Sequence, residues 1–179
     1  MTWSAPMTAV AGATFTAAQF NQYVRDNLNE TAPAKATAAS QLFVSTGANA
    51  IATRTPATAR VDTSQSTAST SYVDLTTPGP SLTATTGTIA IIMFACEIAN
   101  NTNNSLAKCS VAVSGSSTVA ASDNWTLSMD GNAANNFSRG SMVHIFTGLT
   151  AGSNTFKMVY AVGSNTGTFK NREINIIPL

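Results

Sequence analysis

The chain has 179 residues, enough for one ordinary domain with an extension or for two small domains. Charged residues make up only 9% and the formal net charge is +1 without a cluster of Lys or Arg, which argues against a nucleic-acid partner. The start lacks the basic and apolar parts of a signal peptide, and no apolar run approaches the roughly 18 residues of a membrane span, so we expect synthesis in a cytoplasm and no membrane partner.

Residues 1–14 show no clear period and predict an irregular N-terminal arm. Trp3 is its informative residue, because a large aromatic side chain near a terminus gains much from burial in a pocket. Two alternatives stay open for Trp3: a pocket on a partner protein, or packing onto the chain's own domain.

Thr16–Leu28 is the one predicted helix. Thr16 and Gln19 fit a capping box, and Phe15 and Phe20 fit the hydrophobic staple that accompanies it. The stripe at helical spacing consists of Phe20, Tyr23, Val24 and Leu28. A single amphipathic helix must cover this stripe with its own β domain, with sister helices about a symmetry axis, or with a groove of another protein. Together with Trp3 and Phe15, the stripe is our candidate anchoring surface.

Residues 34–60 are rich in Ala, Thr, Ser and Gly, which is typical of an extended linker. One short strand-like piece at 41–45 and a turn at 47–49 interrupt this composition. We therefore expect an anchoring arm with its helix over 1–33, a linker over 34–60 and a β domain over 61–179.

Beyond residue 61, short strands alternate with turn residues. The predicted strands cover 71–76, 81–86, 88–99, 106–114, 124–129, 141–147, 154–162 and 168–177. Eight antiparallel strands in about 120 residues favour a mainly β fold, an eight-stranded jelly-roll sandwich of two sheets. Its expected core includes Cys109, Val111, Val113, Trp125, Leu127, Met129, Phe156, Met158, Tyr160, Val162, Ile174 and Ile176.

The strand predicted over 88–99 is apolar on both faces. Because a sandwich strand normally keeps one polar face, the second apolar face requires a cover, and the simplest cover is another copy of the chain. We therefore expect an oligomer. The residues assigned to its interface or to the core are Ile89, Ile91, Ile92, Met93, Phe94, His144, Phe146 and Tyr160.

Nothing in the sequence predicts a catalytic or metal site, and we expect neither enzymatic activity nor a cofactor. His144 is the one histidine and is flanked by Met142 and Phe146, as in a core or interface position. The Asp-Gly pair at Asp130 is better explained by a hairpin turn than by a calcium loop. Cys96 and Cys109 could lie opposite each other in a hairpin, either as a disulfide or as buried thiols.

Two C-terminal stretches and one upstream stretch resemble tumour-necrosis-factor-like jelly rolls in structural proteins of tailed bacteriophages. Thr147–Phe156 and Asn171–Leu179 resemble the last hairpin of these domains, and Asp74–Ser81 resembles the first. The resemblance implies a trimer, with three jelly rolls about an axis.

The N-terminal part of the chain is similar to the opening of minor tail and decoration proteins in phages of actinobacteria. This similarity rests on Thr16–Asn29, on Trp3 before it and on Thr46–Ala50 after it. It implies a non-enzymatic protein of the virion whose N-terminal segment docks on capsid or tail proteins. The favoured role is a trimeric capsid decoration or cement protein. The alternative is a minor tail or fibre protein that binds a host-surface glycan through loops 100–105 and 130–137.

Overall fold

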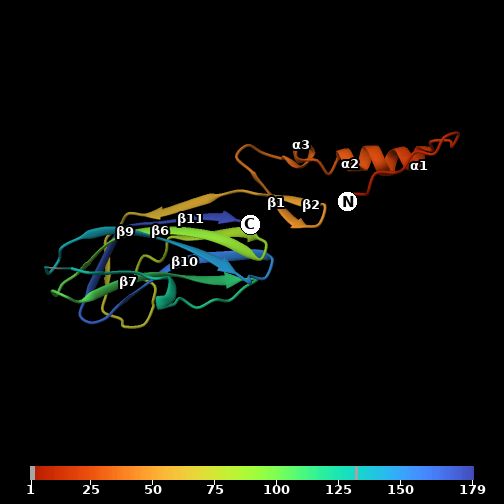
Figure 1. Cartoon of the computed structure of the whole chain (residues 1–179). Helices are drawn as coiled ribbons and strands as arrows, with labels where there is room; N and C mark the ends of the chain where they lie inside the picture. The colour runs from red at the N-terminus through yellow and green to blue at the C-terminus, as the bar shows by residue number, and fades with distance from the viewer. Residues whose placement is uncertain (1–2, 132) are drawn as a thin grey trace. The chain divides into compact units, whose positions relative to one another are not determined.

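The chain divides into two compact units, residues 1–55 and 56–179. The structure is a computed structural model that describes residues 3–131 and 133–179. In the first unit, α1 (Ala17–Phe20), η1 (Asn21–Arg25) and α2 (Asp26–Leu28) follow one another without a break. They form the single helix expected from the sequence, with a π-helical turn at its centre (Figure 1). A short helix, α3 (Ala32–Lys35), comes next.

The start of the long helix has the capping geometry that its sequence predicts. The hydroxyl of Thr16 accepts a hydrogen bond from the backbone N–H of Gln19 at 3.2 Å, and the Gln19 side chain accepts one from the backbone N–H of Thr16 at 2.9 Å. The rings of Phe15 and Phe20 lie edge to face with centroids 6.1 Å apart. The local sequence alone thus specifies where this helix begins.

The first unit ends in a β-hairpin of β1 (Leu42–Gly47) and β2 (Ala50–Arg54). Asn49 adopts a positive φ of 56° in the connecting turn, a conformation that Asn tolerates better than most residues. The strand-like piece at 41–45 and the turn at 47–49 therefore belong to one local structure.

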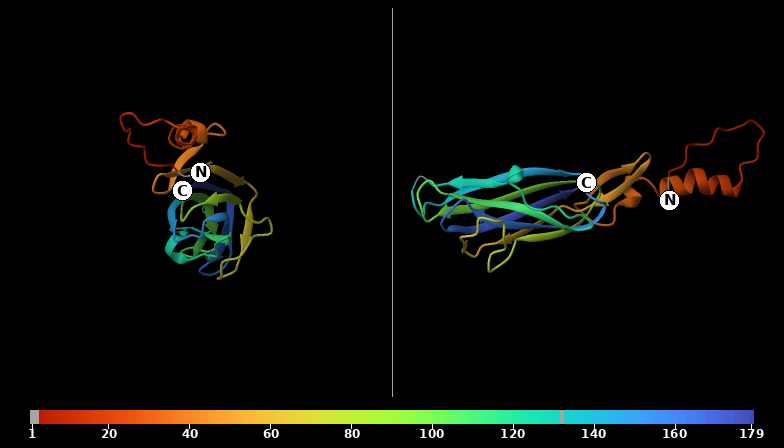
Figure 2. Two further views of the ribbon diagram at one scale, coloured as in Figure 1. Left: turned by 90° about the vertical axis from the view of Figure 1, so that its right-hand side faces the viewer. Right: turned by 90° about the horizontal axis from the view of Figure 1, so that it is seen from below.

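The second unit is a sandwich of two antiparallel sheets (Figures 1 and 2). One sheet has the order β5-β10-β7-β8 and the other the order β3-β11-β6-β9, with β4 added alongside β11. The strands are β3 (Ala57–Val61), β4 (Gln65–Thr67), β5 (Ser81–Thr86), β6 (Ile89–Asn100), β7 (Leu106–Gly115), β8 (Leu127–Asp130), β9 (Ser138–Thr147), β10 (Gly152–Val162) and β11 (Gly167–Pro178). Successive strands from β5 to β8 and from β8 to β11 alternate between the sheets, except where β7 and β8 pair. The jelly-roll sandwich expected from the sequence is therefore confirmed, whereas a trimer is not part of the structure of this single chain.

Strand β6 is an interior strand, between β11 and β9. Its inward side is fully buried and consists of Ala90, Ile92, Phe94, Cys96 and Ile98. Together with the inward residues of the facing sheet, such as Val111, Phe156, Met158 and Tyr160, they form the one contiguous core among the described residues. Every buried member of this core lies in the second unit.

One predicted strand is wrong. Residues 71–76 form no strand; their backbone pairs with β10 at one isolated bridge between Val73 and Tyr160, and Asp74 forms an ion pair with Lys157 of β10 at 2.7 Å. The edge strand of the β11 sheet is instead β3, which pairs with Arg172–Ile176. Its Ala and Thr residues carry too little hydrophobicity to be recognised from the sequence, and they form a strand because β11 offers a free edge.

The two cysteines are not partners across a hairpin. Cys96 lies on β6 and Cys109 on β7, which belong to different sheets because residues 101–105 carry the chain across the sandwich. Both are free thiols and fully buried. Burial is the main cause that raises the pKa of Cys109, and the hydrogen bond with the Cys96 thiol is the second cause. Of the two alternatives for the cysteines, the structure therefore contains buried thiols and not a disulfide.

Candidate functional site

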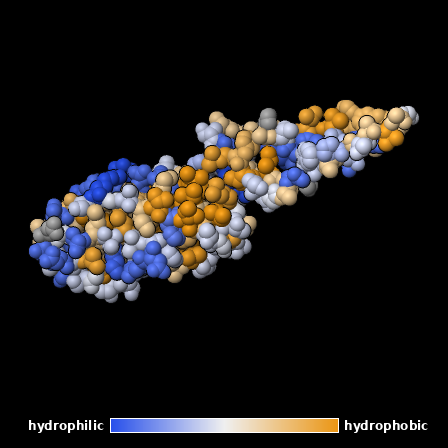
Figure 3. Space-filling view, in the orientation of Figure 1, coloured by the Kyte–Doolittle hydropathy of each residue, from blue (hydrophilic) through white to orange (hydrophobic). Residues whose placement is uncertain are grey.

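The outward side of the β11-β6-β9 sheet has an apolar half. Across the strands, Ile91 pairs with Ile145 of β9 and with Ile177 of β11, while Met93 pairs with Val143. Val143 and Ile145 are 58% and 53% exposed and Ile89 is 37% exposed. We call this set the apolar face; it comprises Ile89, Ile91, Met93, Val143, Ile145 and Ile177. Figure 3 shows hydrophobic residues gathered at one end of this side of the sandwich and hydrophilic residues at the other.

The other half of the same sheet side is polar and internally ion-paired. Glu97 lies 3.2 Å from the amine of Lys170 and 3.8 Å from the guanidinium of Arg139. Arg139 also lies 3.7 Å from Glu173, as does Arg60. Two hydrogen bonds lower the pKa of Glu97; the larger effect comes from Asn171 and the smaller from Lys170. Arg60 also forms an ion pair with Asp62, so this half carries three cationic and three acidic side chains.

The outward side of the other sheet differs in both composition and cover. Its exposed residues on β5 are Ser and Thr, and the hydroxyls of Thr83 and Thr155 hydrogen-bond across two strands at 2.7 Å. Val73 bridges to Tyr160 and Val119 bridges to Val113, so two irregular segments run along this sheet. The apolar face is thus the sheet side that is both hydrophobic and uncovered within the described second unit.

The structure separates the predicted interface residues into two groups. Ile89, Ile91 and Met93 point outward, as described. Ile92, Phe94, Phe146 and Tyr160 are buried in the core of the chain itself. The remaining residue, His144, points inward on β9, where its ring stacks on Trp125 at 4.9 Å.

The N-terminal unit exposes most of the predicted anchoring residues. Phe15 and Phe20 are each 49% exposed, Leu28 is 61% exposed, and Tyr23 and Val24 are half-buried. The amide of Asn27 makes two hydrogen bonds with the backbone of Ser4, at 2.8 and 3.0 Å, and so holds the arm along the helix. The arm therefore covers one side of the helix and leaves Phe20 and Leu28 outward.

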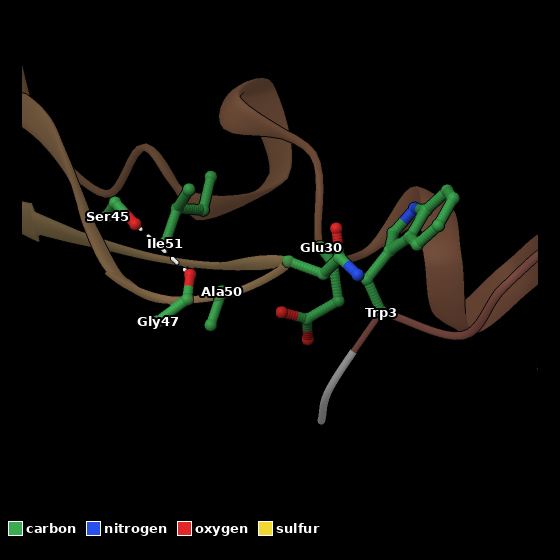
Figure 4. A pocket seen from close by; sticks show the side chains of 7 residues that line it. Trp3, Glu30, Ser45, Gly47, Ala50 and Ile51 are labelled. Atoms are coloured by element: carbon green, nitrogen blue, oxygen red, sulfur yellow. Dashed lines mark hydrogen bonds between the residues drawn. The ribbon is translucent and has the colours of Figure 1, made fainter.

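Trp3 lies at a pocket of about 320 Å³ within the first unit (Figure 4). The pocket is lined by Trp3, Glu30, Ser45, Gly47, Asn49, Ala50 and Ile51. Glu30 forms an ion pair with Lys35 at 2.8 Å, and the hydrogen bond from Lys35 is the main cause that lowers the pKa of Glu30. Trp3 lines this pocket and is still 36% exposed, so both alternatives for Trp3 stay open.

The loops nominated for glycan binding meet at one end of the sandwich. The backbone N–H of Asn104 donates to Gly131, and that of Asn135 donates to Asn100. Residues 163–166, which sequence reasoning did not include, join them through a bond from Asn101 to Thr166. Asn104, Asn135 and Asn165 have φ of 54°, 60° and 61°, respectively, so turn geometry accounts for Asn at these positions. Asn132 lies outside the described residues.

Sequence reasoning missed the role of Arg172, which is the largest fully buried side chain of the described chain. Its guanidinium donates to the carbonyls of Thr77 and Gly79 at 3.0 and 3.1 Å and to Thr63 at 3.2 to 3.3 Å. The hydroxyl of Tyr160 donates to the same Gly79 carbonyl at 2.7 Å. Arg172 therefore ties residues 63–79 to β11. An arginine in a strand of alternating Ile is the sequence signal for such a buried donor.

Neither a metal-binding cluster nor a membrane-spanning helix is found in the described part of the chain. Residues 3–131 and 133–179 contain no group of three or more His, Cys, Asp or Glu side chains placed to bind a metal ion. None of the helices in these ranges combines the length and apolar content of a membrane span.

Comparison with known proteins finds similarity at the level of structure. No family model matches the chain, and no curated protein matches it. The structure of infectious bursal disease virus Gx strain is similar with a TM-score of 0.46 and 11% identity over 74% of this chain and 35% of that chain. The crystal structure of the VP2 subviral particle of infectious bursal disease virus is similar with a TM-score of 0.43 and 10% identity, over 74% of this chain and 36% of that chain. The structure of Eiger TNF from S. frugiperda is similar with a TM-score of 0.42 and 7% identity, over 70% of this chain and 92% of that chain. The chain thus spans about a third of the viral chains that it matches.

Proposed function

We propose that this chain is a non-enzymatic structural protein of a bacteriophage particle, in which residues 1–55 anchor it to capsid proteins and the jelly-roll sandwich projects outward as a decoration domain. The observation that carries the proposal is the unequal distribution of buried apolar residues. The contiguous core lies wholly in the sandwich, whereas seven of the twelve large hydrophobic residues that are exposed in the described chain lie in the first unit.

A segment with this composition is stable when a partner covers it. The helix over 17–28 is shorter than an isolated helix usually needs in water, and a two-stranded hairpin alone is only marginally stable. The charges of the first unit are largely paired with each other, Arg25 with Asp26 at 2.7 Å and Lys35 with Glu30. Its partner surface is therefore an apolar groove of a protein rather than a strongly charged one. The resemblance of Thr16–Asn29 to virion proteins supports the same role.

The proposal is tested by incorporation into particles. Phage particles are assembled with only one form of this protein present, either the full chain or a variant. The particles are purified on a density gradient, and the protein in them is quantified by mass spectrometry. We expect the full chain to be present in many copies, and a variant without residues 1–30 to be reduced at least about tenfold, because the anchoring side chains are removed. Full-length chain absent from particles would refute the virion role.

Point variants separate anchoring from loss of the segment. Phe20→Asp with Leu28→Asp places charges on the exposed stripe and should reduce incorporation as the deletion does. The matched control is Ala18→Asp with Gln22→Asp, exposed positions on the same helix, which should be incorporated normally. Equal incorporation of the two double variants would refute the anchoring role of the stripe.

A second candidate function is that of a minor tail or fibre protein that binds a host-surface glycan. It is favoured by the meeting of loop 100–105 with the described residues of loop 130–137 at one end of the sandwich. The copy number from the same experiment distinguishes the two functions, since hundreds of copies per particle correspond to a shell protein and a few copies to a tail protein.

A further inference from the structure

The arm over residues 3–14 is fastened to the helix over 17–28 by one side chain, that of Asn27. Its amide oxygen accepts a hydrogen bond from the backbone N–H of Ser4 at 2.8 Å. Its amide nitrogen donates to the carbonyls of Ser4 and Tyr23, at 3.0 and 3.2 Å. Three of the four hydrogen bonds that an asparagine amide is able to form are thus made. No other hydrogen bond within the described chain joins the arm to this helix.

The burial of Asn27 makes these bonds important for the position of the arm. Asn27 is buried, whereas the next two residues, Leu28 and Asn29, are exposed. Removal of a buried donor leaves its acceptors unsatisfied, which costs more than the loss of a bond exposed to water. The bonds to Ser4 also span 23 residues of the chain. They therefore decide where the arm lies, rather than where the helix begins or ends.

The same bonds set the place of Trp3, because Trp3 directly precedes Ser4. The indole lines the pocket that also contains Glu30 and residues of the β1-β2 hairpin (Figure 4). Asn27 thus links the arm to the helix at the point where the arm meets the hairpin. Trp3 is 36% exposed, so part of its ring is available to another molecule.

The helix presents its own exposed residues on one side. The backbone N–H of Asp26 donates to the carbonyl of Asn21, five residues earlier, and this bond makes the π turn. Seven residues span about two turns of an α-helix, and a π turn takes up one residue more. Phe20 and Leu28, which are eight residues apart, therefore lie on the same side of the helix, and both are exposed.

We propose that Asn27 is a positioning residue of the anchoring segment, which holds the arm so that Trp3 is presented to the partner together with Phe20 and Leu28. This inference rests on the proposed function. A surface that is formed before binding avoids the cost of ordering the arm at the contact. Asn27 acts through Trp3 and does not itself contact the partner, because its side chain is buried within the first unit.

The first part of the test measures whether Asn27 holds the arm in the free chain. Asn27→Ala removes all three hydrogen bonds, and alanine has the higher helix propensity, so the arm is released without weakening the helix. Exchange of the Ser4 N–H, followed by NMR, should be at least about tenfold faster than in the wild type. Asn29→Ala, at an exposed position of the same helix end, is the matched control and should leave this exchange unchanged. Unchanged Ser4 exchange in Asn27→Ala overturns the inference.

The second part measures incorporation into phage particles. Asn27→Ala and Trp3→Ala should each be reduced at least about fivefold, whereas Asn29→Ala should be incorporated normally. The double variant Trp3→Ala with Asn27→Ala should be reduced no further than Trp3→Ala alone, because Asn27 acts through the position of Trp3. Losses that add in the double variant, or normal incorporation of Asn27→Ala, overturn the inference.

The failure of this inference is distinguishable from that of the proposed function. Wild-type chain absent from particles refutes the proposed function and this inference with it. Normal incorporation of Asn27→Ala, beside reduced incorporation of the variant with charges at Phe20 and Leu28, overturns this inference alone and leaves the anchoring role intact.

Discussion

At the scale of the residue, Arg172 is the most constrained side chain of the sandwich. It is fully buried, and its hydrogen bonds within the described chain go to oxygens of Thr63, Thr77 and Gly79. Its Nε has no partner there, and the guanidinium carbon lies 5.4 Å from the ring centroid of Tyr160. Strand β4 ties the start of this segment to β11, and Arg172 ties Thr63, Thr77 and Gly79 to the same strand.

Arg172→Ala should lower the free energy of unfolding by about 3–5 kcal/mol, because it leaves buried carbonyls without donors and opens a cavity. Arg172→Met retains most of the volume and should cost less. Urea unfolding of both variants measures the two contributions. A loss below about 1 kcal/mol for the alanine variant would show that water replaces the guanidinium without cost.

His144 lies at the edge of the sandwich, where β9 faces the segment before β8. Its ring packs between Trp125, at 4.9 Å, and Phe146, at 4.6 Å. Burial lowers the pKa of His144 from its ordinary value of 6.5. The folded state therefore favours the neutral imidazole.

The sign of the pH dependence follows from this shift. The unfolded chain binds the proton at a higher pH than the folded chain, so the contribution of His144 is fully present above about pH 6.5 and is lost as the pH falls through the folded pKa. The wild-type chain should lose stability between pH 7.5 and 5, and His144→Phe should lose clearly less. Urea unfolding at the two pH values checks this. Carboxylates begin to titrate near the lower end of this range, but they are the same in both proteins, so parallel losses would contradict the assignment to His144.

At the scale of the element, the alternation of apolar residues predicted strand bounds well where both the strand and its neighbours in the sheet are hydrophobic. Strands β6, β7, β10 and β11 begin and end within two residues of their predicted bounds. Their inward residues are large and aliphatic or aromatic, and such residues favour strands wherever they are placed.

Prediction failed where pairing rather than composition makes the strand. Strand β3 consists of Ala, Thr and Arg before Val61, and it is a strand because five of its residues pair with β11. Conversely, residues 71–76 contain Tyr72, Val73 and Leu75, yet their backbone pairs with the sheet at a single isolated bridge. Leu75 is buried in the core itself, so its hydrophobicity serves packing and not strand pairing.

At the scale of the whole molecule, the two units differ in how they are stabilised. The sandwich contains the entire contiguous core, including Phe94, Phe156 and Phe169. In the described part of the first unit, the buried residues are Asn27 and Val44, each at the margin of burial. The sandwich is therefore expected to fold without the first unit.

Residues 56–179 alone should unfold cooperatively with a midpoint within about 3 °C of the full chain at equal concentration. Limited proteolysis of the full chain should remove the first unit before any cut in the sandwich, since exposed backbone with few buried contacts is cleaved first. Differential scanning calorimetry and mass spectrometry of the fragments check the two statements. A fragment that is unfolded at 25 °C would show that residues 1–55 belong to the folding unit.

The sequence by itself determined the helix start at Thr16, the mainly β class and the presence of a strand with two apolar sides, because capping and alternation are local properties of neighbouring residues. The tertiary structure decided which side of β6 stays outward, that Val143, Ile145 and Ile177 extend it, and that Ile92, Phe94 and Tyr160 belong to the core. It also decided the positions of Cys96, Cys109 and Arg172. These depend on which strands meet across the sandwich, and contacts between residues far apart in the chain leave no periodic signal in either segment alone.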